Sequence, residues 1–160
     1  MIRNPNYLLC ISSAGFFVTS YYGYLQQSKL FVLDLASATF SLIYWCDPNN
    51  KNKRNIDIVA ANITGIYFFI YGNIFIEGNM RYLAWFNLAG ILSCFTISCI
   101  YHSYNYRGWK WFHFAFHAFT FINKIIYYAN VGTWNPIKDE LFPFIHIRET
   151  PSFSINSFLA

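Results

Sequence analysis

The chain has 160 residues, of which 56% are hydrophobic, 22% aromatic and only 11% charged. Soluble domains carry about 25% charged residues, so this composition predicts a membrane protein and argues against an ordinary soluble domain. The formal net charge of +4 is spread over short polar segments and forms no basic patch. We therefore expect no nucleic-acid partner.

The first apolar run covers residues 7–25 and follows Arg3. A signal peptide also begins with a basic residue before an apolar stretch. This run, however, is long, tyrosine-rich at its far end and without a clear small-x-small cleavage site. The sequence therefore favours a retained membrane span over a cleaved signal.

The second apolar run, residues 30–46, is shorter than the ~20 residues that usually cross a hydrocarbon core. It contains Asp34, and a carboxylate is costly inside a membrane. The side chain can extend to the membrane surface near Lys29, or it can face a partner inside the bundle. The sequence leaves both interpretations open.

The polar segment 47–55 is the clearest break in the chain, and the third apolar run, residues 56–76, follows it. Asp57 lies in the expected first turn of this run, where an acidic side chain suits the helix dipole and can cap the helix. The run also has small residues at helical spacing, which favour close packing against a neighbouring helix. They are Ala60, Ala61, Thr64 and Gly65.

Two further apolar runs, residues 81–101 and 109–129, complete an all-α fold. The sequence thus predicts a polytopic transmembrane helix bundle of about five spans within residues 1–129. Residues 130–160 contain three prolines and mixed charge, which predicts an irregular or interfacial tail.

The basic residues predict the orientation of this bundle. With five spans, the amino terminus and the second and fourth loops lie on one side of the membrane. Most Lys and Arg residues fall there, so the positive-inside rule predicts a cytoplasmic amino terminus. These residues are Arg3, Lys51, Lys53, Arg54, Arg107 and Lys110.

The fifth run carries four polar residues on one helical stripe, because they recur at i, i+4, i+7 and i+11. They are His113, His117, Thr120 and Lys124. Ionisable residues within a membrane normally face a partner, a cavity or a metal. This stripe is therefore the first candidate for a functional site.

The alternation of spans predicts that other polar residues lie at the depth of this stripe, near the cytoplasmic face: Ser41, Trp45, Cys46, Asp57 and His102. Histidines one turn apart, such as His113 and His117, can share a zinc ion, and a catalytic zinc needs a third protein ligand. By depth, His102, Cys46 and Asp57 are the candidates. Alternatively, the histidines belong to an interfacial aromatic belt.

This order of residues resembles the CREST superfamily, which includes alkaline ceramidases and progestin/adipoQ receptors. Ser41 to Trp45 stands in the place of the family's Ser-x-x-x-His, Asp57 in that of its aspartate, and His113 to His117 resembles the receptors' His-x-x-Phe-His. Two departures are visible. Trp45 stands where the family has its first histidine, and the chain has five apolar runs where the family has seven spans.

The resemblance implies zinc bound by His113 and His117, with Ser41 and Asp57 as catalytic residues that assist the zinc-bound water or the oxyanion. Zinc lowers the pKa of its water to about 7 and polarises the carbonyl that is attacked. The substrate that the resemblance implies is a lipid amide whose acyl chain enters the bundle.

Two functions from different classes are therefore expected. The first is a zinc-dependent lipid amide hydrolase or a lipid receptor of the CREST type, with membrane lipids as partners. The second is a non-catalytic structural membrane protein, or a subunit of an organelle or virion membrane complex, with partner membrane subunits. A channel or transporter is a third option, but the chain has no internal repeat to favour it.

Overall fold

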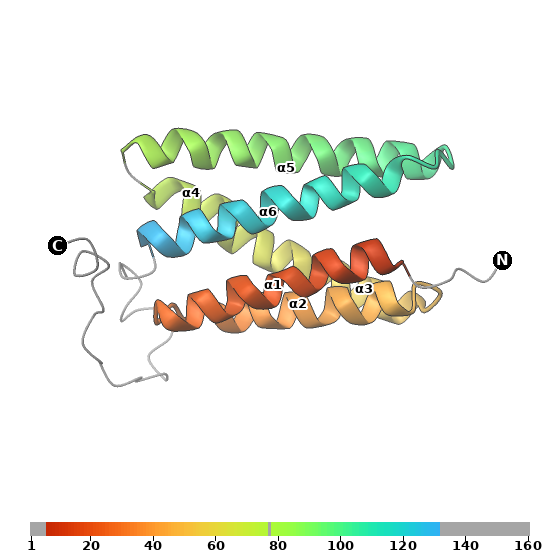
Figure 1. Cartoon of the computed structure of the whole chain (residues 1–160), viewed down its shortest axis with the longest axis horizontal. Helices are drawn as coiled ribbons and strands as arrows, with labels where there is room; N and C mark the ends of the chain where they lie inside the picture. Colours follow the sequence, from red (N-terminus) through yellow and green to blue (C-terminus); the bar gives the residue numbers. More distant parts are fainter. Residues whose placement is uncertain (1–5, 77, 132–160) are drawn as a thin grey trace.

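The computed structural model describes residues 6–76 and 78–131, and in these residues it is all-helical, as predicted (Figure 1). The expected tail beyond residue 131 lies outside the described residues. The elements follow one another as α1 (Tyr7–Leu25), α2 (Phe31–Cys46), α3 (Lys51–Gly65), the π-helix η1 (Ile66–Tyr71), α4 (Gly72–Phe75), α5 (Asn79–Ser103) and α6 (Trp109–Val131).

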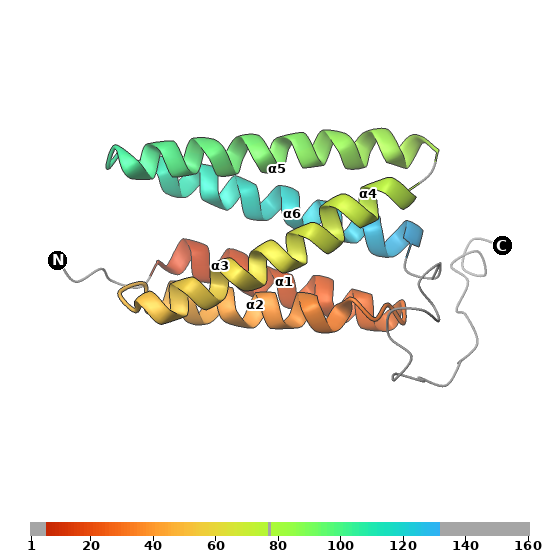
Figure 2. The same ribbon diagram turned by 180° about the vertical axis from the view of Figure 1, so that it is seen from behind.

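The elements α3, η1 and α4 follow one another without a break, so the described part of the chain forms five long rods that run back and forth between two ends. Figure 2 shows that the third rod is oblique: α3 starts beside α2, and α4 ends beside α5 and α6. The remaining contacts join α1 to α2, α1 to α6, and α5 to α6. Helix α6 is thus the element that connects the two halves of the bundle.

The start of α3 differs from the prediction. The side chain of Asn50 accepts hydrogen bonds from the backbone N–H groups of Asn52 (3.0 Å) and Lys53 (3.2 Å), which is the geometry of a helix cap. Helix α3 therefore begins at Lys51, five residues before the predicted run. Asp57 lies in the second turn, so its predicted role as the cap was wrong.

Two glycines allow α6 to approach its neighbours closely. A Cβ atom built at Gly90 of α5 would lie 2.9 Å from the ring of Phe119, and one at Gly23 of α1 would overlap the ring of Tyr128. Neither position has room for a side chain unless the aromatic ring moves. The close packing of α6 against α1 and α5 therefore requires glycine at these two positions.

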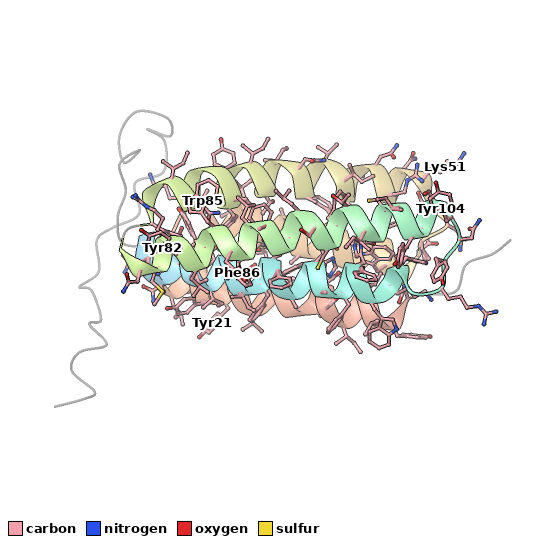
Figure 3. All side chains as sticks on the ribbon, turned by 90° about the horizontal axis from the view of Figure 1, so that it is seen from above. Tyr21, Lys51, Tyr82, Trp85, Phe86 and Tyr104 are labelled. Carbon is pink, nitrogen blue, oxygen red and sulfur yellow. The ribbon has the colours of Figure 1, made fainter. Side chains whose placement is uncertain are left out.

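Polar residues lie inside the bundle and large apolar residues lie outside. Among the described residues, 15 polar or charged side chains are buried against 13 apolar ones, and the buried polar set includes Asp34, Asn73, Asn123 and Lys124. Large apolar side chains on the outer surface are open to the surroundings, as for Phe86 with 68% exposed. Figure 3 shows this outward direction for Tyr82, Trp85 and Phe86.

Within the described residues, α1 and α5 are long and apolar enough to cross a membrane, and α2 is a shorter apolar helix. Length and apolarity therefore account for two of the five predicted spans. Helix α6 is long enough, but it carries two lysines and two histidines. Those four side chains lower its apolarity even though its neighbours cover most of them.

Candidate functional site

The two histidines of α6 are neighbours in space, and each is held by a serine from a different helix. The ring centroids of His113 and His117 are 4.9 Å apart. Nδ1 of His117 lies 2.7 Å from Oγ of Ser12 on α1, and Nδ1 of His113 lies 3.3 Å from Oγ of Ser98 on α5. Three helices therefore meet at this pair, which fixes the orientation of both rings.

A second polar group lies beside this pair and joins α1, α2 and α3. The carboxylate of Asp57 lies near the hydroxyl of Ser41 and interacts with it. Oγ of Ser41 lies 3.0 Å from Oγ of Ser13, and both serines are buried. Because Ser12 and Ser13 are adjacent on α1, one short piece of α1 connects the histidine pair to the Ser41–Asp57 pair.

Trp45 fills the side of the site where the CREST pattern has a histidine. Its ring centroid is 5.1 Å from that of His113 and 6.1 Å from that of Trp109, and the side chain is buried. Its Nε1 atom is buried with no hydrogen-bond partner among the described residues. An indole donor placed against His113 offers a hydrogen bond but cannot ligate a metal.

His102 lies on the outer side of this group. Its ring packs edge-on against Trp109, with centroids 4.9 Å apart, and Trp109 in turn contacts His113 at 6.2 Å. The structure thus brings Trp45, His102 and His113 together, and the indole of Trp109 contacts both histidines. Ser12 and Ser13 were missed by the sequence analysis, because two serines in an apolar run carry no motif.

The zinc site that the resemblance implies requires several metal-binding side chains close together. Within residues 6–76 and 78–131, no three His, Cys, Asp or Glu side chains come together as a group that could hold a metal ion. The histidine pair supplies two neighbouring imidazoles, and the position of a third is filled by Trp45. Zinc at His113, His117 and His102 therefore stays a prediction, and no chemical step is assigned to it.

The other end of the α6 stripe forms an ion pair in the bundle interior. The Lys124 ammonium donates to the carboxylate of Asp34, and both side chains are almost completely buried. Asp34 also accepts from Thr19 (2.7 Å) and from the phenol of Tyr128 (3.4 Å). The interpretation that Asp34 extends to the membrane surface was therefore wrong.

Aromatic rings connect this ion pair to the histidine pair. Nζ of Lys124 lies 4.3 Å from the ring centroid of Phe16, and the same ring is 5.1 Å from that of His117. Phe16 is therefore the layer between the two polar groups, and the α6 stripe faces the interior from His113 to Lys124. The arrangement can hold polar groups of a bound molecule, and it can stabilise the bundle.

Comparison with known proteins adds no further assignment. No family model, curated protein or solved structure matches the chain. The functional argument therefore rests on the geometry of the chain itself.

Proposed function

We propose that this protein is an integral membrane protein whose five long helices all cross the bilayer. The observation that carries the proposal is the inverted distribution of side chains, with polar groups buried and large apolar groups exposed among the described residues. In water the stable arrangement has apolar side chains inside and polar ones outside, because burial of apolar surface stabilises a soluble fold by about 25 cal/mol per Å². In lipid, exposed apolar side chains are solvated, and buried polar groups are satisfied by one another.

The charged residues support the orientation in this proposal. The end of the bundle where α3 and α6 begin carries Lys51, Lys53, Arg54, Arg107 and Lys110, whereas the opposite end carries Lys29 and Arg81. Basic residues are retained on the cytoplasmic side. We therefore assign the first end, which also contains the histidine pair, to the cytoplasmic face.

Labelling of single cysteines tests the number of spans. In a protein with its four native cysteines replaced by serine, Asn49→Cys, Met80→Cys and Tyr104→Cys place a thiol on exposed positions at the two ends. With five spans, an impermeant maleimide labels residues 49 and 104 from the same side and residue 80 from the other. If only α1 and α5 cross, residue 49 is labelled together with residue 80. That result would refute the five-span proposal.

We propose that this membrane protein acts as a non-catalytic component whose interior is a degenerate counterpart of the CREST site. The position of Trp45 against His113 supports this, because an indole replaces the ligand that completes the metal centre of a zinc hydrolase. Structural membrane proteins and subunits of membrane complexes need the packed bundle and not the chemistry. Partner membrane subunits and membrane lipids are the proposed partners.

A lipid amide hydrolase is the second candidate, and the proximity of Ser41 and Asp57 beside two histidines favours it. Metal analysis of the purified chain separates the two functions. The non-catalytic proposal expects substoichiometric zinc and no release of fatty acid from a fluorescent ceramide, with His117→Ala unchanged on both counts. One zinc per chain, lost in His117→Ala, together with turnover that Asp57→Asn abolishes, would establish the hydrolase instead.

A further inference from the structure

An apolar groove with a volume of about 430 Å³ lies between α2 and α3. The small side chains of Ala36 and Ala60 leave the space, and larger apolar side chains form its walls. Val59 and Phe40 are 58% and 37% exposed, so the groove opens to the outside of the bundle and not to the histidine site. In a bilayer this groove faces lipid.

The length of the groove fits an acyl chain in one leaflet of a bilayer. Its lining on α3 runs from Asn55 to Thr64, which at ~1.5 Å per residue spans about 14 Å. One leaflet of a hydrocarbon core is roughly 15 Å deep, half of the ~30 Å core.

The ends of the groove differ in polarity. The lining becomes polar at Asn55. Lys51 lies one helical turn before Asn55, on the same face of α3. Lys51 and Arg54 are exposed, and Figure 3 shows Lys51 at the end of the bundle. Lys53 is already paired with Asp47 at 2.8 Å. The groove therefore has an apolar body and a cationic mouth, which is the complement of an anionic amphiphile.

We propose that this groove binds one acyl chain of an acidic phospholipid, with Lys51 at the headgroup phosphate. The inference rests on the proposed membrane function, since the groove meets lipid only if α2 and α3 lie in the bilayer. The cytoplasmic leaflet is rich in anionic lipids, and each Lys or Arg near such a surface favours binding by about fivefold. A second copy of the chain is the competing occupant, and the cationic mouth argues against it, because a second copy carries the same net positive charge of +4.

Photocrosslinking of the full chain in vesicles tests the acyl-chain part. The probe is phosphatidylserine with a diazirine in its acyl chain, present as a minor component of phosphatidylcholine vesicles, and mass spectrometry maps the adducts. Adducts are expected to concentrate on Phe40, Val59 and Ile63. Ala60→Phe, which fills the groove, should reduce them several-fold. The matched control, Ala89→Phe at an exposed position of α5, should leave them unchanged.

The charge part is tested with the same probe. Lys51→Glu should lose the preference for phosphatidylserine over an equally labelled phosphatidylcholine, by about fivefold or more. Lys110→Glu makes the same change at the same end of the bundle, at an exposed position of α6, and should keep the preference. Equal loss in both variants would show a general surface charge and would overturn the assignment of the headgroup to Lys51.

Other outcomes overturn the lipid site as a whole. The lipid site would be refuted if the adducts were spread evenly over all exposed helices and Ala60→Phe did not change their amount. A dimer in the same vesicles that Ala60→Phe converts to a monomer would also refute it, because the occupant would then be a second copy. Resistance of the chain to alkaline carbonate extraction is measured on each sample. A resistant chain without groove adducts refutes only this inference, whereas an extracted chain refutes the membrane proposal.

Discussion

At the scale of single residues, the contact with the largest expected effect on stability is the pair of Asp34 and Lys124. The pair lies between α2 and α6, is shielded from the surroundings, and is completed by hydrogen bonds from Thr19 and Tyr128. Desolvation offsets much of the attraction in such a pair, so the pair itself stabilises the fold little. Removal of one partner is costly, because the other charge stays buried without compensation.

Lys124→Met should therefore lower the free energy of unfolding by about 3–5 kcal/mol. The double variant Asp34→Asn, Lys124→Met should recover most of this loss, since no charge is then left in the interior. Denaturation of the detergent-solubilised protein, followed by circular dichroism, measures both values. Lys110→Met at the exposed start of α6 is the control and should have little effect. A double variant as unstable as the single one would show that the loss is not electrostatic.

At the scale of elements, α6 determines how the two halves of the bundle fit together. It contacts α1 through Gly23 and α5 through Gly90, and both glycines lie against aromatic rings of α6. A side chain at either position forces those rings to move. The two interfaces can therefore pack this closely only because neither glycine carries a side chain.

Gly23→Ala tests this dependence and should lower the stability by about 1–3 kcal/mol, as overpacking usually does. Gly15→Ala is a matched change on the same helix, at a position where a Cβ meets nothing within 4 Å. It should be neutral or stabilise by about 0.4–1 kcal/mol, because alanine restricts the unfolded chain. The thermal midpoints of the two variants provide the comparison. Similar midpoints would mean that the ring of Tyr128 moves aside freely.

Sequence patterns predicted the elements of this bundle better than their boundaries and contacts. The apolar runs coincide with helices because runs of this length are typical of helices, whereas strands are shorter. The start of α3 was predicted five residues too late, since Lys51 to Asn55 are polar and only the cap at Asn50 identifies them as helical. A polar stretch such as Lys51 to Asn55 therefore does not show by itself that the chain is outside a helix.

At the scale of the whole molecule, the alternation of helices predicted which residues share a layer, but not which atoms meet. The order of the runs placed Ser41 and Asp57 at one depth, and the two side chains lie close enough to interact. The contacts of Ser12 with His117 and of Asp34 with Lys124 could not be predicted in the same way. They depend on the rotation of each helix about its axis, which is set by packing against several neighbours at once.

The distance in sequence between Asp34 and Lys124 has a consequence for synthesis. The two residues are 90 positions apart, and a ribosome adds about 5–20 residues per second, so Asp34 emerges roughly 5–18 s before its partner. During that time the carboxylate in the first turn of α2 has no Lys124 to pair with. We therefore expect α2 to reach its final packing only after α6 has been made, so that a helix late in the described part of the chain completes the environment of an early one.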